Sequence, residues 1–329
     1  MWKGKRLDIF FYEAFEEEAE ALKRYLPGDI SAGFIFKTIQ ESGDAEPGGA
    51  VISIRTQSVI PTSWSSKISG ILTRSTGYDH IKSYLQKCGR FVGSGYLPLY
   101  CGRAVAEQAI LLSMALLRKL PQQVEQFSSF HRDGLTGREC QGKNLLVVGV
   151  GNIGYEVVKV AGALGMNVAG VDIVERHSAV KYVSIEEGIA QADIIICAMN
   201  LTSENIAYFN YRLLKKSNPG VIFVNVARGE FSPSADLLKL LDEGRLSAVA
   251  LDVFNNEPEL AVSLRTNAAS DDNEIKATLE LAKRPNVILT PHNAFNTSES
   301  VDKKASQSIE QIKHFLEHGN FKWSVPLES

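Results

Sequence analysis

The segment from Leu145 to Val160, LLVVGVGNIGYEVVKV, constrains the fold more than any other part of the chain. A short apolar run is followed by Gly149, Gly151 and Gly154 in the spacing GxGxxG, and then by a helix-like pattern. In such a unit the first glycine permits a tight turn, the second lets the backbone approach a pyrophosphate, and the third lets the helix pack on the strand. Amide groups and the dipole at the helix N-terminus would face the phosphates. The segment predicts a dinucleotide-binding βα unit.

A second apolar run, NVAGV, leads to Asp172, which lies 23 residues after Gly149. A carboxylate there accepts hydrogen bonds from the hydroxyl groups of the adenine ribose and repels a 2′-phosphate. The expected cofactor is therefore NAD rather than NADP, although Arg176 lies close enough in sequence to influence this preference. Asn152 and Ile153, at the start of the predicted helix, are also expected to bind the cofactor.

Strand-like and helix-like segments alternate along the rest of the chain, whose 329 residues suggest two domains. LDIFF, AVISI, GILT and RFVGS are predicted strands, separated by the helices EAFEEEAEALKRYL and DHIKSYLQKC. A second series runs from GKNLLVVG through ADIIICAMN, GVIFVNVARGE, AVALDVF and NVILT. This alternation predicts an α/β fold with two Rossmann-like or flavodoxin-like domains and parallel sheets.

Three further segments need their own interpretation. The stretch 104–120 is apolar on nearly every face, which predicts a helix that is buried or shared with another subunit. The segment Glu259 to Arg284 is longer than an ordinary βα connection, and both a functional insertion and a surface excursion remain open. From about Thr297 the chain reads as a polar amphipathic helix that ends near Gly319.

Composition excludes several classes of function. The net charge of −3 comes from 35 basic and 38 acidic residues without a long run of one sign, so no nucleic acid or membrane partner is expected. The four cysteines are scattered. His314 and His318 are four residues apart, a spacing that can bind metal, but a solvated helix end is the expected interpretation, so no metal site is expected. No signal peptide or apolar run of ~18 residues is present, which favours a cytoplasmic protein.

Three polar residues each follow a predicted strand. Arg228 ends VIFVNVAR, Glu257 follows ALDVFNN, and His292 follows NVILTP. Ligands of open α/β sheets bind outside the carboxyl ends of the strands, so these side chains could enter one crevice. Each residue alone has an ordinary structural interpretation: a capping arginine, a solvated glutamate or a packed histidine. Together, downstream of a dinucleotide motif, they indicate a catalytic group.

These residue types suit hydride transfer to a 2-keto acid. A guanidinium stays charged, and it can polarise a ketone while holding a carboxylate with two parallel hydrogen bonds. An imidazole can give a proton to a developing alkoxide and take it back. A neighbouring carboxylate orients the ring and favours its protonated form. We therefore predict Arg228, Glu257 and His292 as catalytic residues.

The chain resembles the D-isomer-specific 2-hydroxyacid dehydrogenases over nearly its whole length, and within that family the D-lactate dehydrogenases. The resemblance rests on GVGNIG with Asp172, on NVARGE, LDVFNNEP and TPHNAF, and on STGYD and AVAE. It implies a substrate domain of residues 1–101 and 297–329, with an NAD domain of residues 102–296 inserted into it. It also implies a homodimer, formed with the help of the long apolar helix.

The resemblance also assigns roles to single residues. It implies that Arg228, Glu257 and His292 form the catalytic trio, and that backbone amides of the STG turn hold the substrate carboxylate. Other residues expected to bind substrate or cofactor are Thr76, Gly77, Tyr100, Ala227 and Asp252. Read without the resemblance, Asp252 is a turn residue at a strand end and Tyr100 a packed aromatic.

The expected activity is NAD-dependent reduction of a 2-keto acid to a D-2-hydroxy acid, with pyruvate and D-lactate as the first choice. A bulkier keto acid or phosphite oxidation remains open, because Cys101 and Gln108 depart from the family pattern and leave substrate preference undecided. The alternative from another class of function is a binding protein that has the same fold and senses NADH.

Overall fold

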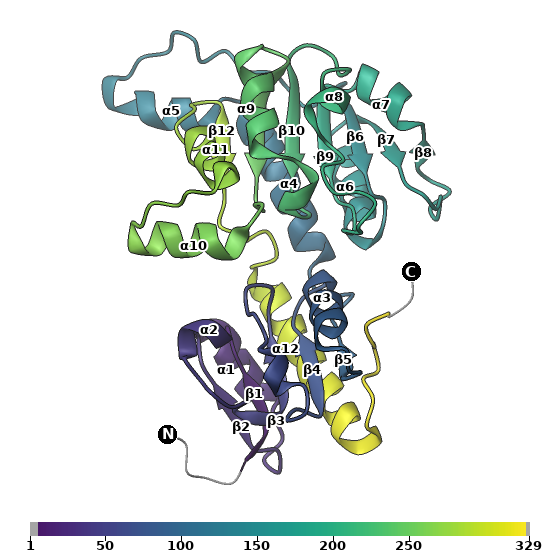
Figure 1. The fold of residues 1–329 in the computed structure, drawn as a ribbon. Coiled ribbons are helices and arrows are strands. Elements are labelled where there is room, and N and C mark those ends of the chain that lie inside the picture. The colour runs from purple at the N-terminus through teal and green to yellow at the C-terminus, as the bar shows by residue number, and fades with distance from the viewer. Residues whose placement is uncertain (1–5, 327–329) are drawn as a thin grey trace. The chain divides into compact units, whose positions relative to one another are not determined.

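The computed structural model describes residues 6–326, which form two compact units. The terminal unit combines the described residues up to Cys101 with those from Asn296 onward, and the central unit is Gly102–Phe295. Each unit contains one parallel sheet covered by helices, as Figure 1 shows. The predicted fold class is confirmed: an α/β chain with two parallel sheets.

The sheet of the terminal unit has five parallel strands in the order β2-β1-β3-β4-β5. The strands are β1 (Leu7–Phe11), β2 (Ala32–Phe34), β3 (Gly49–Ile54), β4 (Gly70–Thr73) and β5 (Gly93–Gly95). The sequence did not predict β2, since three residues with a central glycine give no strand pattern. The last strand also begins later than the predicted RFVGS, because Arg90 and Phe91 are exposed.

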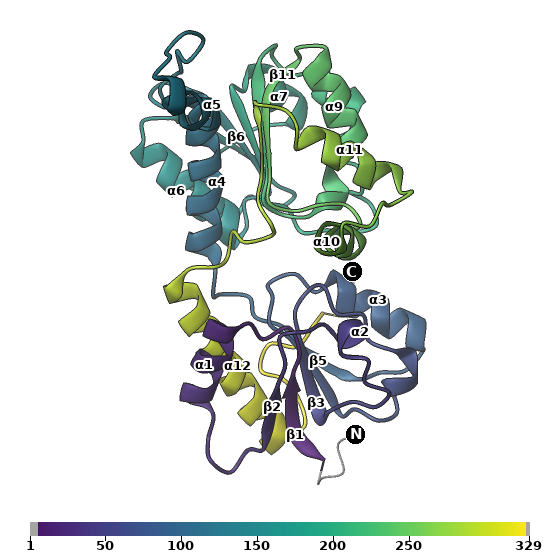
Figure 2. The same cartoon turned by 90° about the vertical axis from the view of Figure 1, so that its left-hand side faces the viewer.

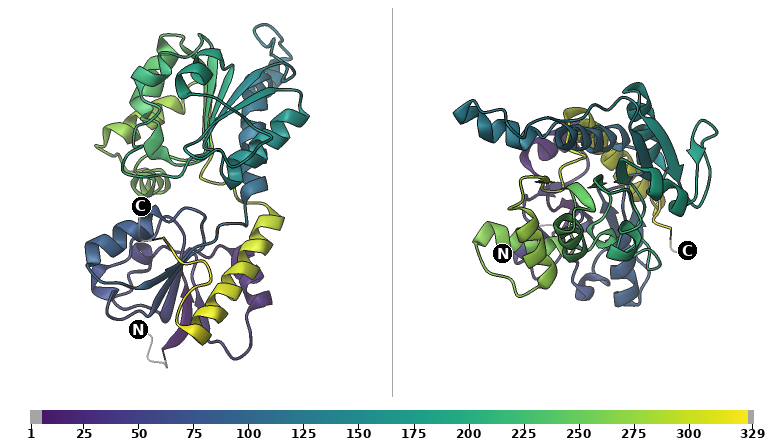
Figure 3. Two further views of the ribbon diagram at one scale, coloured as in Figure 1. Left: turned by 90° about the vertical axis from the view of Figure 1, so that its right-hand side faces the viewer. Right: turned by 90° about the horizontal axis from the view of Figure 1, so that it is seen from above.

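Helices cover both faces of this sheet. They are α1 (Glu16–Tyr25), α2 (Ile39–Ser42), α3 (Asp79–Cys88) and α12 (Ser298–His318), with a 3-10 turn at Thr62–Trp64. In Figure 3, α12 lies beside α1 on one face, with α3 on the other. The predicted C-terminal helix is confirmed: Thr297 caps its first turn, and Gly319 ends it at a φ of 77°.

The sheet of the central unit has seven parallel strands in the order β12-β11-β10-β9-β6-β7-β8. The strands are β6 (Asn144–Val148), β7 (Asn167–Val171), β8 (Lys181–Tyr182), β9 (Ile194–Cys197), β10 (Val221–Asn225), β11 (Leu246–Leu251) and β12 (Val287–Leu289). Strand order reverses between β6 and β9, so the carboxyl ends of these two strands border a crevice where such folds bind ligands.

Helices also cover both faces of the seven-stranded sheet. They are α4 (Gly102–Leu117), α5 (Leu120–Gln126), α6 (Asn152–Ala163), α7 (Ile185–Gln191), α8 (Tyr211–Leu214), α9 (Ser234–Asp242), α10 (Glu257–Thr266) and α11 (Asn273–Leu281), with 3-10 turns at Phe127–Ser129 and Gly229–Phe231. Figure 2 shows α4 and α6 on one face of the sheet and α9 and α11 on the other.

The apolar stretch 104–120 forms two helices instead of the single predicted one. The chain breaks at Lys119, whose φ is 53°, and restarts with Leu120 and Pro121. Pro121 lies in the first turn of α5, where a helix tolerates a residue without an amide hydrogen, so the proline suits the start of a new helix. Most of α4 is buried against α6 and the sheet, as its composition predicted.

None of the helices in the described part of the chain is long and apolar enough to cross a membrane.

Candidate active site

The glycine turn after β6 has the geometry that a dinucleotide requires. Gly149 has a φ of 90°, and a Cβ there would lie 2.6 Å from the Met199 amide nitrogen, so the turn passes close to the end of β9. A Cβ on Gly154 would lie 1.9 Å from the Gly149 carbonyl oxygen. A Cβ on Gly151 would meet nothing within 4 Å, which leaves open space at the N-terminus of α6. Asn152 and Ile153 form the first turn of this helix.

Asp172 connects the neighbouring strand end to this turn. Its Oδ2 accepts a hydrogen bond of 2.6 Å from the Val150 amide, and its Oδ1 accepts one of 3.0 Å from the Val174 amide. A carboxylate has about four acceptor positions, so both oxygens can still accept ribose hydroxyl groups. The open turn, the helix N-terminus and this half-buried carboxylate fit the phosphates and ribose of NAD.

The turn after β10 presents Arg228. Asn225, which is fully buried, donates through Nδ2 to the Arg228 carbonyl at 2.8 Å and accepts from the Ala227 amide at 3.0 Å. A Cβ on Gly229 would lie 1.9 Å from the Phe254 carbonyl carbon, so only glycine lets this turn pack on the one after β11. Asn225 and Gly229 therefore fix the backbone that carries Arg228 and Ala227.

Glu257 and His292 are in direct contact. Nδ1 of His292 lies 2.8 Å from Oε2 and 2.9 Å from Oε1 of Glu257, and the side chains are 20% and 17% exposed. Glu257 is the first residue of α10, which follows β11, and His292 follows the adjacent strand β12. Since β10, β11 and β12 are adjacent and parallel, all three predicted catalytic residues follow the same edge of the sheet.

Asp252 holds the turn that carries His292. Its carboxylate accepts hydrogen bonds from the Thr290 hydroxyl at 2.5 Å, the Asn293 amide at 2.9 Å and the Ala294 amide at 2.8 Å. The side chain is fully buried, and burial raises the pKa of Asp252 above its ordinary value despite these bonds. The turn residue His292 has a left-handed φ of 51°. All of these contacts agree with the interpretation of Asp252 as a turn residue at the end of a strand.

The long segment after Glu257 forms α10 and α11. Asn256, which precedes Glu257 and has a φ of 52°, donates through Nδ2 to Glu259 at 2.8 Å and to Asp272 at 3.0 Å. Asp272 in turn caps the N-terminus of α11. The segment is therefore a two-helix excursion in which the residues that precede α10 and α11, Asn256 and Asp272, are bonded together beside Glu257.

The predicted substrate residues lie in the terminal unit, where β4 and β5 end. The loop Ser75–Gly77 is closed by a hydrogen bond of 2.7 Å from the Ser75 hydroxyl to the Gly77 carbonyl. Thr76 Oγ1 lies 3.4 Å from Cys101 Sγ. Tyr100 is 7% exposed, and burial raises its pKa well above the ordinary value.

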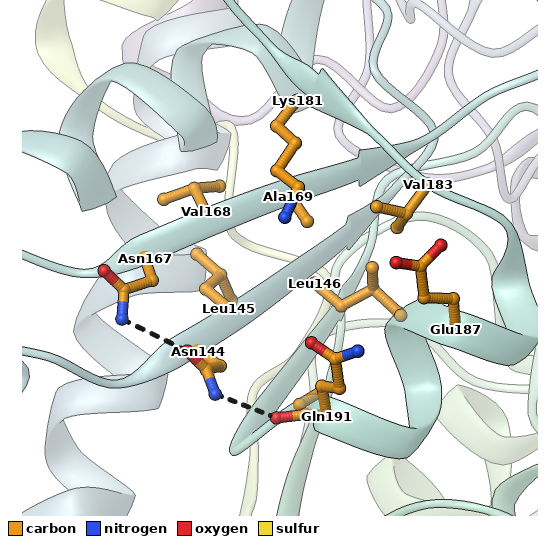
Figure 4. A pocket seen from close by; sticks show the side chains of 12 residues that line it. Asn144, Leu145, Leu146, Asn167, Val168, Ala169, Lys181, Val183, Glu187 and Gln191 are labelled. Atoms are coloured by element: carbon orange, nitrogen blue, oxygen red, sulfur yellow. Dashed lines mark hydrogen bonds between the residues drawn. The ribbon is translucent and has the colours of Figure 1, made fainter.

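The hollow drawn in Figure 4 is not part of this site. It has a volume of about 470 Å³ and is lined by residues that include Asn144, Asn167, Lys181, Glu187 and Gln191. Asn144 and Asn167 are the first residues of β6 and β7, so the hollow lies at the opposite strand ends from the glycine turn. Among residues 6–326 there is no group of three His, Cys, Asp or Glu side chains that could hold a metal ion.

Sequence reasoning missed several residues that shape these sites. Asn225 bonds to the backbone of Arg228, and Asn256 makes its bonds at the start of the helix that carries Glu257. No sequence motif distinguishes these two asparagines. His80 bonds to Thr73 at 3.0 Å below the Ser75–Gly77 loop. Glu18 and Lys304 are completely buried, although their sequence surroundings are those of solvated helices.

Comparisons with known proteins agree with this geometry. The family described as D-isomer specific 2-hydroxyacid dehydrogenase, NAD binding domain, matches residues 110–294, more than half of the chain. An aromatic 2-oxoacid reductase of Clostridium sporogenes is 30% identical over 78% of this chain and 78% of its own length. A D-lactate dehydrogenase of Streptococcus agalactiae is 29% identical over 77% of each chain.

A solved structure extends the similarity to the whole fold. The D-lactate dehydrogenase of Aquifex aeolicus, complexed with NAD and lactic acid, is 25% identical, and its TM-score is 0.82. The match covers 98% of this chain and 100% of that one.

Proposed function

Because the chain belongs to the family of D-isomer-specific 2-hydroxyacid dehydrogenases and is an NAD-dependent enzyme of that class, we propose that it reduces pyruvate to D-lactate. The family and NAD as cofactor are confirmed predictions. Pyruvate is proposed because D-lactate dehydrogenases are among the relatives. The aromatic 2-oxoacid reductase among them makes phenylpyruvate the principal competitor.

The contact between Glu257 and His292 carries the proposal. With Nδ1 bonded to Glu257, the imidazole presents Nε2 as the nitrogen that gives a proton to the substrate oxygen. The carboxylate orients the ring and fixes its tautomer, so that Nε2 faces away from Glu257.

Arg228 acts on the substrate itself. Its guanidinium polarises the keto group and holds the neighbouring carboxylate, while Asn225 keeps the Arg228 backbone in place. Gly149, Gly151, Asn152, Ile153, Gly154, Asp172, Ala227 and Asp252 are the proposed cofactor-binding residues. Bound NADH supplies the hydride.

The proposed substrate-binding residues are Thr76, Gly77 and Tyr100. Backbone amides of the Ser75–Gly77 loop bind the carboxylate of the keto acid, and the loop is already ordered by the Ser75 hydrogen bond. A loop ordered in advance loses little conformational entropy when it binds.

The proposed assembly is a homodimer in the cytoplasm. Large apolar side chains are exposed on α4, on α5 and in the 3-10 turn after it: Leu111, Met114, Leu120, Val124, Phe127 and Phe130. These elements contact one another, and several large exposed apolar side chains on neighbouring elements are typical of subunit interfaces. All four cysteines are free thiols, which suits a reducing compartment.

NADH oxidation with a panel of keto acids tests this function. Pyruvate, 2-ketobutyrate, phenylpyruvate, oxaloacetate and glyoxylate are compared with the purified protein and with His292→Ala. Pyruvate turnover that falls by about 10²–10⁴ in the variant supports the proposal. Turnover of none of the acids by a protein that still binds NADH contradicts it.

A further inference from the structure

Three ionisable side chains of the terminal unit form a buried charge cluster: Glu18 of α1, Arg74 after β4 and Lys304 of α12. Each of the three side chains is 0% exposed. Arg74 Nε lies 2.9 Å from Glu18 Oε1, and Lys304 Nζ lies 2.8 Å from the same oxygen. Two cations therefore share one carboxylate oxygen.

Arg74 and Glu18 have a clear structural role. The guanidinium also donates through Nη1 to the Ser53 hydroxyl at 2.9 Å and through Nη2 to the Tyr12 carbonyl at 2.7 Å. These bonds tie the end of β4 to the ends of β1 and β3. One arginine already neutralises one glutamate, so this pair needs no second cation.

Lys304 is therefore the surplus charge. With one carboxylate against two cations, the buried charge cluster has a net charge of +1 when Lys304 is protonated. Burial of an ion costs several kcal/mol that packing alone does not return, and an apolar residue of similar length would fill the same space. A structural role does not account for an ammonium at this position.

The surplus charge lies beside Tyr100, one of the residues that are proposed to bind substrate. Arg74 directly precedes the Ser75–Gly77 loop, and Lys304 Nζ is 5.9 Å from the centre of the Tyr100 ring. The ionisable groups that act on Lys304 come from several elements: Glu18 on α1, Arg74 after β4, Arg55 after β3, and Tyr100 and Cys101 before α4.

We propose that Lys304 supplies the positive charge that the substrate carboxylate compensates, so that binding of the keto acid requires Lys304 to be protonated. The inference rests on the proposed function, since it concerns the same substrate site. Lys304 is a positioning residue in this scheme. Its charge attracts the substrate carboxylate from behind Tyr100 and the Ser75–Gly77 loop, and it does not touch the reacting atoms.

The charge of Lys304 can change near neutral pH. Burial, which Glu18 opposes and which Arg55 and Arg74 reinforce, lowers the pKa of Lys304 to about 7. Below that pH the ammonium is present and attracts the carboxylate. As the pH rises through this value, the free enzyme loses the charge and KM should rise. The bound carboxylate raises the pKa of Lys304, so KM stops rising once the pH exceeds the pKa of the substrate complex.

The experiment compares Lys304→Met with Lys303→Met, an exposed lysine on the same helix. KM and kcat for pyruvate are measured on both sides of pH 7, and thermal unfolding is followed by circular dichroism. At low pH we expect Lys304→Met to raise KM about tenfold with kcat nearly unchanged, and the pH dependence of KM to flatten. Its Tm should not fall, because an apolar side chain replaces a buried charge.

A second measurement removes the proton transfer by His292 from the comparison. Binding of oxamate, an unreactive analogue of pyruvate, to the NADH complex is measured in a His292→Gln background with and without Lys304→Met. Binding that weakens with pH only when Lys304 is present supports the inference. Equal KM values in Lys304→Met and Lys303→Met overturn it and leave the proposed function intact, whereas absence of turnover with every keto acid refutes the function itself.

Discussion

At the scale of single residues, the contact between Glu257 and His292 makes a specific prediction about catalysis. Glu257→Gln keeps a hydrogen-bonding side chain but removes the carboxylate charge that orients the ring through Nδ1. We expect kcat/KM for pyruvate reduction to fall roughly 10–100-fold. Steady-state rates of pyruvate reduction measure this, with Glu280→Gln, an exposed residue of α11, as the control. An unchanged kcat/KM would separate Glu257 from the chemistry.

Glu18 makes a prediction about stability at the same scale. Burial opposes its ionisation, yet Arg74 and Lys304 lower the pKa of Glu18 to about 2. A pKa below the ordinary 4.5 means that Glu18 stabilises the fold above that pH and that this contribution is lost as the pH falls toward 2. Glu18→Gln leaves two buried cations without their carboxylate, so the free energy of unfolding should fall by about 3–5 kcal/mol.

Urea denaturation at neutral pH measures the Glu18 effect. Glu20→Gln, on the same helix but exposed, is the control and should be neutral. If both variants unfold at the same urea concentration, the buried charge cluster does not stabilise the terminal unit.

At the scale of elements, α10 and α11 hold Glu257, the proposed partner of His292, through Asn256. Its amide bonds to Glu259 and Asp272 fix the start of α10, where Glu257 is the first residue. Asn256→Gly preserves the left-handed backbone and removes only the amide. Loss of these bonds, worth ~1 kcal/mol each, should lower kcat about fivefold with little change in KM.

Asn267 offers a matched control for this element. It ends α10 with a similar φ of 54°, so Asn267→Gly changes the backbone preference in the same way at the other end of the helix. Equal kcat values for the two variants would mean that the excursion does not position Glu257.

At the scale of the whole molecule, the exposed apolar side chains on α4, α5 and the turn after it predict self-association. Phe127 and Phe130 are 75% and 74% exposed, and α5 extends away from the sheet of the central unit in Figure 3. Phe127→Asp combined with Phe130→Asp should convert a two-chain particle into single chains, because a charge in a dimer interface is costly to desolvate. Light scattering after size-exclusion chromatography measures the mass, and a wild-type monomer would contradict the proposed homodimer.

Periodic apolar patterns made much of this architecture predictable from sequence. GILT and DHIKSYLQKC match β4 and α3 residue for residue, because buried parallel strands and amphipathic helices have clear apolar patterns. Strand β2 was missed because three residues cannot show a period. The break at Lys119 was missed because Arg118 and Lys119 are residue types that helices also contain, and Leu120 resumes the apolar pattern.

The candidate site was predictable where a residue follows a strand and its chemistry is distinctive. Arg228, Glu257 and His292 satisfy both conditions. The supporting contacts of Asn225 and Asn256 depend on residues brought together by the fold, and no spacing in the sequence indicates them. Glu18 follows two glutamates and looks solvated, so only the packing of α1 against α12 reveals its burial.

The left-handed backbone of His292, with a φ of 51°, lowers the stability of the protein at a residue that its proposed activity requires. A residue with a Cβ pays about 1–2 kcal/mol for this conformation, and asparagine tolerates it better than most. Replacement of His292 by asparagine should therefore give a protein that is inactive yet more resistant to heat than the parent, as a differential scanning measurement would show. Selection for thermal stability alone would not favour histidine at this strained position. We therefore attribute its presence to a requirement for activity.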